Sequence, residues 1–350
     1  MAGGTLIAAP SGMPALTLPD GRFVDAQSIN INFARSRSNV INARAYMIEY
    51  DDLDFESLVP VDRSVPEWAN GIDTYVGDIV GKADWYTGAA KDIPIADTTE
   101  DMITSKFSMF AVGYQWNLEE LGKAQFMNFP LSPRRAMAAR RAAREFEFVN
   151  AISGSVKKKY PGLINQTGVT PTTLPADGTG SATFWVNNSG VAVKTPAQIV
   201  RDMDNMVLGP VNPDSTAVNV LADTLLLPPL AYRHIATTPY GETSPNKTIL
   251  QYYLDNNLYR ARTGRQVTIR ELPQLSRAAT QGTVGGGRAL AYRNTSDVLT
   301  MYYPMPFRFL PVYQDGPIHW TVPGIGRIGQ VDVMLPYAFR YFDGVTPVPA

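Results

Sequence analysis

The pattern of apolar and polar positions predicts a long amphipathic helix near the middle of the chain. It opens at Ser132 and Pro133, a capping residue followed by proline at the first helical position. Apolar side chains then recur every three to four residues, which predicts a helix over 132–150. Its apolar face holds Ala139, Ala142, Ala143, Phe146 and Val149, and mostly opposite lie Arg134, Arg140, Arg141, Arg144, Glu145 and Glu147. We interpret the arginines as a solvated or salt-bridged face.

A second helix begins a segment in which helices and strands alternate. It starts at Thr195 and Pro196 and ends at Gly209, with an apolar face of Ile199, Val200, Met203, Met206 and Val207. Two more helices are predicted, one starting at the prolines of "PPLAYRHIAT" (228–237) and one after Ser244. Because they alternate with the strand-like "AVNVLAD" (217–223) and "QVTIREL" (266–272), residues 195–270 are predicted to form an α/β unit.

Strand-forming residues dominate much of the rest. A polar, glycine-rich stretch is followed by "MITSKFSMFAVGYQW" (102–116), which predicts a long hairpin with a polar tip that leads into a short helix, "NLEELGKAQ" (117–125). Further strands are predicted at "ALAY", "DVLTMYY", "IHWTV" and "QVDVML", all between residues 289 and 335. Residues 1–35 are predicted to be an extended arm, which becomes ordered only when another surface holds it.

Composition narrows the class of protein. The 350 residues can bury a substantial core, and the formal net charge of −1 provides no overall basic field for nucleic-acid binding. The absence of cysteine excludes disulfides and thiolate chemistry. Prolines and glycine interrupt the apolar N-terminal stretch, so neither a signal peptide nor a membrane span is predicted.

Gly324, Gly326 and Gly329 have the G-x-G-x-x-G spacing of a dinucleotide-binding turn. That motif requires a helix directly after the turn, whereas residues 330–334 alternate polar and apolar side chains like a strand. We therefore expect a glycine-rich turn between two strands and no bound cofactor.

No motif indicates catalysis. His234 and His319 lie far apart in apolar or aromatic contexts, so we expect both to be packed structural histidines. The acidic run "DDLDFE" (51–56) lacks the glycine of a calcium loop and predicts an acidic surface turn. Neither an enzyme activity nor a metal site is predicted.

The order of the parts resembles the major capsid proteins of tailed phages, which have the Hong Kong 97-type fold. The resemblance covers roughly residues 35–345 and includes the hairpin, the returning strand, the arginine-rich helix and the segment "PGLINQTGV" (161–169). The C-terminal part, with a "V-P-G-I-x-R-x-G" turn and a closing "Y-x-D-G", is similar to one capsid subfamily.

This resemblance implies an α+β capsid fold with four parts. Residues 1–35 would be the N-terminal arm and 75–106 the extended loop that reaches over a neighbouring subunit. Residues 36–74, 107–190 and 285–350 would form the peripheral domain, with 132–150 as its spine helix. Residues 191–284 would form the axial domain, at the centres of hexamers and pentamers.

The resemblance also implies partners and a location. The chain would assemble with itself into an icosahedral virion shell around double-stranded DNA, in the cytoplasm of a bacterial host and without a membrane. A portal, a decoration protein and a scaffolding protein are expected partners, and the scaffold is expected to be separate because about 35 residues cannot contain one. Lys82 and Lys91 lie in the hairpin. No partner residue for a covalent cross-link between either lysine and a neighbouring subunit can be identified from the sequence.

Charge suggests how subunits meet. Residues 77–104 carry six acidic residues and two lysines, net −4, whereas residues 131–159 carry eight basic residues and two glutamates, net +6. We expect the hairpin of one subunit to lie on basic surface of the next. The expected contact residues are Lys82, Trp85, Tyr86, Lys91, Asp92 and Ile93 from the hairpin, and Arg134, Arg140, Arg141 and Arg144 from the helix.

Two other functions remain open on the sequence alone. The same fold would suit the shell of an encapsulin-like bacterial nanocompartment that holds an enzyme cargo. A soluble α/β enzyme of the hydrolase class is the alternative from a different class, and it would be a monomer or a small oligomer.

Overall fold

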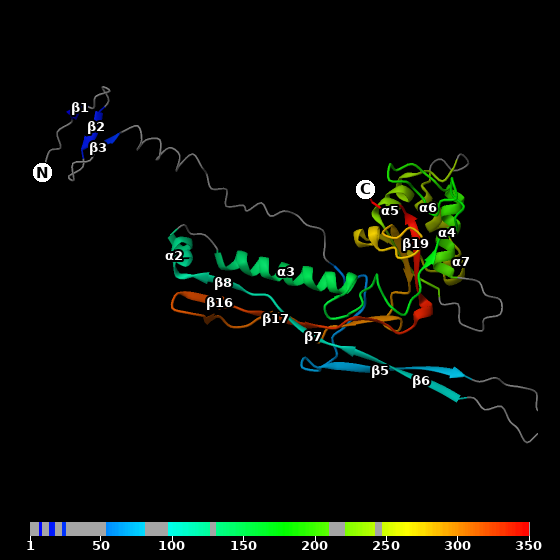
Figure 1. Cartoon of the computed structure of the whole chain (residues 1–350), viewed down its shortest axis with the longest axis horizontal. Helices are drawn as coiled ribbons and strands as arrows, with labels where there is room; N and C mark the ends of the chain where they lie inside the picture. The colour runs from blue at the N-terminus through cyan, green and yellow to red at the C-terminus, as the bar shows by residue number, and fades with distance from the viewer. Residues whose placement is uncertain are drawn as a thin grey trace, which may run out of the picture. The chain divides into compact units, whose positions relative to one another are not determined.

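The computed structural model divides the chain into two compact units (Figure 1). One unit is Met1–Asp52 and the other is Leu53–Ala350. The structure describes residues 7–8, 14–17, 23–25, 54–80, 97–126, 131–209, 221–241 and 247–349. The predicted arm therefore falls in the first unit, and every predicted helix in the second.

Three short strands form an antiparallel sheet in the first unit. They are β1 (Ile7–Ala8), β2 (Pro14–Thr17) and β3 (Phe23–Asp25), and each pairs with the next along the chain. The sequence predicts only an extended arm in this region, so these strands are missed by the prediction. Strands of two to four residues are too short to produce a recognisable alternation of polar and apolar positions.

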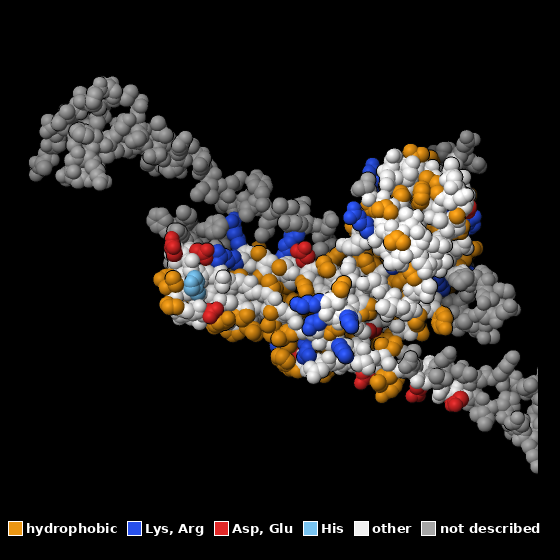
Figure 2. Space-filling model, in the orientation of Figure 1, with side chains coloured by type: hydrophobic (Ala, Val, Ile, Leu, Met, Phe, Trp, Pro, Cys, Tyr) orange, Lys and Arg blue, Asp and Glu red, His pale blue; other side chains and the backbone are white. Residues whose placement is uncertain are grey.

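The predicted hairpin is a two-stranded antiparallel ribbon in the second unit. It pairs β5 (Gly71–Val80) with β6 (Asp97–Lys106), ten residues each and in continuous register. The hairpin is thereby confirmed as far as these strands, and its tip, residues 81–96, lies outside the described residues. Acidic side chains follow the described part of the ribbon in Figure 2.

Two small sheets and a long helix continue from the ribbon. One sheet has the order β14-β17-β7 and the other β15-β16-β8. Their strands are β7 (Ser108–Ala111), β8 (Tyr114–Asn117), β14 (Met305–Phe309), β15 (Tyr313–Gln314), β16 (His319–Val322) and β17 (Gly324–Ile328). α2 (Leu118–Phe126) follows β8, and α3 (Leu131–Ser153) runs beside these strands (Figure 1). The returning strand, the short helix and the long helix are all confirmed.

α3 buries a different face from the one the sequence predicts. Ala139 and Ala143 are buried as expected, but Ala142 is exposed, and Phe146 and Val149 are 45% and 47% exposed. The residues buried in the C-terminal half are instead Glu147, Phe148, Ala151 and Ile152. The prediction fails there because Phe148, Ala151 and Ile152 pack in the main hydrophobic core. The buried side of the helix therefore differs between its two halves.

The glycines of the G-x-G-x-x-G spacing lie in a strand, which corrects the prediction of a turn. Gly324 and Gly326 belong to β17, and Gly329 follows directly after it. The next element is a strand, β18 (Val331–Val333), as the alternation after residue 329 predicts.

These glycines make room for aromatic rings and backbone. A Cβ atom on Gly326 would lie 2.5 Å from Cζ of Phe110, whose ring packs 5.0 Å from that of Phe146 on α3. A Cβ atom on Gly324 would lie 2.6 Å from the carbonyl oxygen of Val112. Close packing around β17, beside α3, therefore explains the glycine spacing that resembles a nucleotide-binding motif.

A five-stranded sheet forms the other end of this unit. Its order is β11-β10-β12-β19-β9, in which β10 pairs parallel with β11 and antiparallel with β12. The strands are β9 (Thr172–Thr173), β10 (Thr224–Leu227), β11 (Thr268–Glu271), β12 (Gly287–Tyr292) and β19 (Phe339–Thr346). The predicted boundary between axial and peripheral domains, at residues 284 and 285, thus falls between strands of one sheet.

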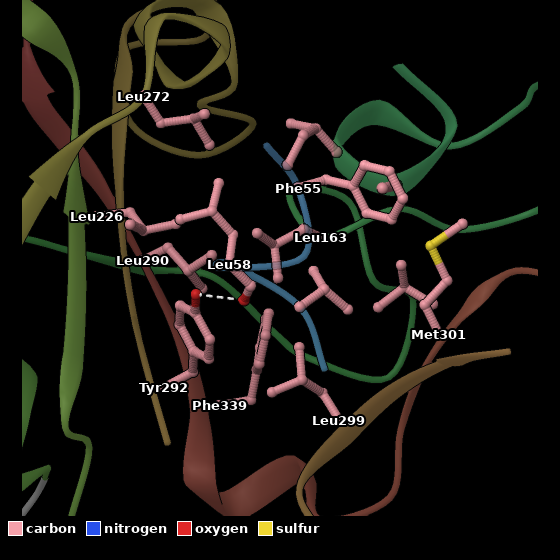
Figure 3. Close-up of a cluster of buried hydrophobic side chains, with 14 of the residues drawn as sticks. Phe55, Leu58, Leu163, Leu226, Leu272, Leu290, Tyr292, Leu299, Met301 and Phe339 are labelled. Carbon is pink, nitrogen blue, oxygen red and sulfur yellow. Dashed lines mark hydrogen bonds between the residues drawn. The ribbon is translucent and has the colours of Figure 1, made fainter. Parts of the chain in front are cut away.

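Two hydrophobic cores pack on opposite faces of this sheet. Leu225 and Leu227 of β10 join the core that contains α4 (Pro196–Leu208), whereas Leu226 points into the other core. The second core also holds Tyr292, whose hydroxyl donates a 2.6 Å hydrogen bond to the carbonyl of Leu58 (Figure 3). Because both faces are covered, β10 and β12 are buried at every position.

The remaining helices cover one face of the sheet, and the predicted start of one of them is wrong. They are α5 (Pro229–Thr237), α6 (Ile249–Asn256) and α7 (Leu258–Thr263). α4 and α5 begin where predicted, but α6 begins after the capping residue Thr248, not after Ser244. Of the strand predicted at 217–223, residues 217–220 lie outside the described residues, and Leu221–Asp223 are not in a strand but directly precede β10.

A third small sheet and two short helices complete the unit. The sheet has the order β18-β13-β4, with β4 (Val61–Asp62) and β13 (Leu299–Tyr302) in parallel. The two single-turn helices are η1 (Pro273–Arg277) and η2 (Pro336–Ala338). The strands predicted at 266–272, 297–303, 318–322 and 330–335 are confirmed with shorter bounds, and the strand predicted at 289–292 is confirmed and begins two residues earlier, at Gly287.

Candidate assembly interface

The ribbon has an outer face that its own described unit does not cover. Tyr75 and Met102 are directly paired across the two strands and are 70% and 51% exposed. Asp73 and Glu100 lie on the same face, two positions away along their strands, and are also exposed. A two-stranded ribbon is only marginally stable by itself in water. Its outer face, an apolar pair flanked by carboxylates, is therefore suited to contact with another surface.

Side chains near the root of the ribbon attach it to the rest of the unit. The hydroxyl of Ser105 donates to the buried carboxylate of Asp332, which also accepts a 2.7 Å hydrogen bond from the side-chain amide of Gln330. Thr74 and Tyr302 share a 3.3 Å hydrogen bond between their hydroxyls. Burial raises the pKa of Asp332 above its ordinary value. The sequence does not point to Ser105 and Asp332, because no spacing signal connects two residues so far apart in the chain.

Six of the predicted contact residues lie between the two strands of the ribbon. Lys82, Trp85, Tyr86, Lys91, Asp92 and Ile93 are all outside the described residues. Their contact with a neighbouring subunit stays a prediction.

The four predicted arginines lie on α3. Arg144 lies 3.5 Å from a carboxylate oxygen of Glu56, and the guanidinium of Arg140 lies 5.6 Å from the ring centre of Phe309. Arg134 and Arg141 are half-buried. The ion pair of Arg144 confirms a partly salt-bridged face, which includes the acidic turn at 54–57. A role of these arginines between subunits stays a prediction.

A buried carboxyl group lies on the face of α3 that the sequence assigns to solvent. Glu147 is 2% exposed and accepts a 2.5 Å hydrogen bond from the hydroxyl of Tyr303. Burial raises the pKa of Glu147. Its spacing of four and eight residues from Ala143 and Ala139 places it on the buried stripe, which is the signal available in the sequence.

A basic turn follows α3 directly. Lys157, Lys158 and Lys159 are consecutive and exposed at the tip of a turn closed by Ser155 and Tyr160. None of the three lysines forms an ion pair with a described residue. We call residues 156–159 the lysine turn. In the sequence these lysines are part of one basic segment and are not separated from the arginines.

Comparison with known sequences decides the family. A family model described as "Major capsid protein" matches residues 81–345. This chain belongs to the major capsid protein family. No curated protein matches it in sequence.

Solved structures agree with this assignment at the level of the fold. The capsid of Myoviridae phage XM1 is similar with a TM-score of 0.69 and 15% identity, over 93% of this chain and 100% of that one. The capsid of a native GTA particle gives a TM-score of 0.55 and 14% identity, over 89% and 97%. A structure from Mycobacterium phage Ogopogo gives 0.53 and 12%, over 85% and 94%. The capsid protein therefore has the α+β Hong Kong 97-type fold.

Membership of the family defines a structural role. The chain is a major capsid protein, a structural component of a self-assembling particle and not an enzyme. Among the residues that the structure describes, no helix is long and apolar enough to cross a membrane.

The two histidines differ in their surroundings. His234 of the capsid protein is buried as predicted, with Nδ1 3.2 Å from the hydroxyl of Thr238. His319 is exposed on β16, so the prediction of a packed side chain is wrong there. It lies at the first position of a short strand near the end of a sheet, where its apolar sequence neighbours point elsewhere.

Proposed function

We propose that this capsid protein forms the icosahedral shell of a tailed phage and encloses double-stranded DNA. The observation that carries the proposal is the ribbon β5–β6, which has an exposed outer face on a subunit whose fold matches a phage capsid protein over 93% of this chain. A surface of this kind is stabilised when many copies of the chain repeat one heterologous contact around a closed shell.

The parts of the chain take their roles from this proposal. Residues 75–106 act as the extended loop over a neighbouring subunit, and 1–35 as the arm. Residues 191–284 lie at hexamer and pentamer centres as the axial domain. The peripheral domain, residues 36–74, 107–190 and 285–350, has α3 as its spine.

The proposed contact between subunits joins the hairpin to the basic segment of the next copy. Its apolar members, Trp85, Tyr86 and Ile93, would each gain about 1.5–3 kcal/mol on burial. The charged members, Lys82, Lys91, Asp92 and Arg134, Arg140, Arg141 and Arg144, would orient the approach and select the partner surface.

The remaining partners follow from the same proposal. A portal, a separate scaffolding protein and a decoration protein complete the particle, which assembles in the cytoplasm of a bacterial host. The exposed apolar side chains of the peripheral sheets, such as Met109 and Tyr313, offer surface for such contacts.

The contents of the particle test this function. Particles that contain this protein are isolated from the cells that produce them, treated with nuclease and extracted. We expect protected double-stranded DNA. A shell that holds a protein cargo and no nucleic acid would contradict the proposal and favour a nanocompartment.

A further inference from the structure

The lysine turn carries positive charge that the rest of the described chain leaves unpaired. In the basic segment 131–159, Arg135 lies 3.0 Å from Glu120 and Arg144 lies 3.5 Å from Glu56. Lys157, Lys158 and Lys159 are exposed, and no described carboxylate lies within ion-pair distance of them. Arg140 is also exposed and lies 5.6 Å from the ring centre of Phe309. The lysine turn therefore adds three consecutive exposed ammonium groups at the C-terminal end of this segment.

The backbone of the lysine turn is held in one shape. Ser155 and Tyr160 exchange two backbone hydrogen bonds of 2.9 and 3.0 Å, and the Tyr160 hydroxyl lies 2.7 Å from that of Ser108 on β7. Lys159 has φ of 58°, a left-handed conformation in which glycine or asparagine would be less strained. A lysine at this position keeps a charge at the tip at some conformational cost, and the closed turn presents three ammonium groups without further ordering of the backbone.

The ribbon carries exposed negative charge that is likewise not paired with a described residue. Asp73, Asp97 and Glu100 are exposed, and none of them forms an ion pair with a described residue. Asp73 only accepts a 2.8 Å hydrogen bond from Thr104 across the ribbon. The lysine turn and the acidic ribbon are therefore two exposed groups of opposite charge on one chain, and within that chain they do not pair with each other.

We propose that the lysine turn of one capsid protein is the docking site for the acidic ribbon of a neighbouring copy. The inference rests on the proposed function and adds the three lysines of the turn to the receiving basic segment. A heterologous contact joins two different patches of identical chains, so charges left unpaired in one copy become paired in the shell. Lysine ammonium groups act as point charges on flexible stems, which suits carboxylates spread along a ribbon.

Cross-linking tests this contact directly, because the chain contains no cysteine. The double variant Lys158→Cys with Glu100→Cys is assembled and treated with a short bis-maleimide cross-linker. We expect a ladder of covalent multimers on a denaturing gel. The matched control replaces Lys158→Cys by Arg262→Cys, an exposed residue on α7, and should give no ladder. Assembled shells of the first variant that yield only monomers would overturn the proposal.

Charge reversal gives a second readout. The lysine variant K157E/K158E/K159E should fold by circular dichroism but assemble on the order of tenfold more slowly, or worse, in low salt. Adding D73K/D97K/E100K to the same chain should restore the rate. The control R233E/R262E/R265E makes the same change in net charge on the exposed arginines of α5 and of residues 262–265, and should assemble normally.

The remaining outcomes distinguish contact between subunits from binding of nucleic acid. A lysine variant that assembles at the wild-type rate but loses binding to a DNA duplex would overturn the contact and assign the turn to nucleic acid. A wild-type chain that stays monomeric at every salt concentration would overturn the proposed function itself, and the contact with it. Shells that form in the wild type and fail to form in the lysine variant, with rescue by the ribbon changes, support both.

Discussion

At the scale of single residues, close packing explains why glycine occupies β17. Gly324 exchanges backbone hydrogen bonds of 3.0 Å with Val112, and any side chain would strike that carbonyl and the ring of Phe307. The aromatic rings beneath α3 therefore determine the composition of the strand. Phenylalanine rings pack against positions 324, 326 and 329, and glycine is the residue that leaves room for them. The spacing of these glycines resembles a nucleotide-binding motif for this reason.

Gly324→Ala should destabilise the subunit by about 1–3 kcal/mol, the usual cost of forcing extra atoms into a packed site. Denaturant unfolding of the subunit before assembly measures this. The control Gly168→Ala places its Cβ in open space, so it should be neutral or slightly stabilising. Equal stability of the two variants would show that the packing around β17 is loose.

Burial of His234 gives stability a dependence on pH. Burial lowers the pKa of His234 below its ordinary value of 6.5, and Nε2 has no hydrogen-bond partner among the described residues. The unfolded state therefore binds the proton more readily, so this contribution to stability is complete above pH 6.5 and falls as the pH drops below it.

The effect of His234 can be separated from that of other groups by comparing variants. His234→Phe should remove part of the loss of stability between pH 7.5 and pH 5 that wild type shows, a range of about one unit above to one and a half below the ordinary histidine pKa. His319→Gln, at an exposed position, serves as the control. An unchanged pH profile of the His234 variant, measured by urea unfolding, would assign the dependence to other groups.

At the scale of elements, local signals in the sequence predict where helices lie better than which face they bury. α4 is predicted with its apolar face and both ends, because Thr195 and Gln198 form a complete capping box and Gly209 ends the helix with φ of 76°. α6 is predicted too early, since Ser244 and Thr248 are both capping residues and only the structure shows which is used.

The buried face of α3 could not be predicted from the helix itself. The set of α3 residues that is buried depends on two different surfaces. One is formed by aromatic rings of β7 and β14, and the other is the main hydrophobic core. Glu147 is buried because Tyr303, distant in the sequence, provides its hydrogen bond. The root of the ribbon escapes prediction for the same reason, since Ser105 and Asp332 meet only in the folded chain.

Shortening the ribbon should leave the fold intact and prevent assembly. Ser105 at the root of the ribbon is buried in its own subunit, whereas Tyr75 and Met102 farther out are exposed. A variant in which residues 82–98 are deleted should therefore give normal circular dichroism and no closed shells by negative-stain microscopy. Each subunit would lose the same contact, and small losses accumulate around a closed assembly.

A length-matched control tests whether the side chains or the length of the hairpin matter. Replacing residues 82–96 with glycine and serine keeps the chain length and removes Trp85, Tyr86 and Ile93. We expect this variant also to fail to assemble. Normal shells from the deletion variant would refute the role of the hairpin, and an unfolded subunit would show that it belongs to the core.

At the scale of the whole molecule, the distribution of charge matters more than its sum. The net charge is −1, yet residues 77–104 and 131–159 have strong charges of opposite sign. We expect attraction between such segments on different copies to speed assembly, and to be screened over about 10 Å at 0.1 M salt.

The state of the purified wild-type chain tests the central claim most directly. Size-exclusion chromatography with light scattering, followed by electron microscopy of the peak, measures whether copies of this chain form a closed shell. The account predicts closed particles of uniform diameter in the megadalton range. A monomer or small oligomer at every concentration and salt condition would contradict it.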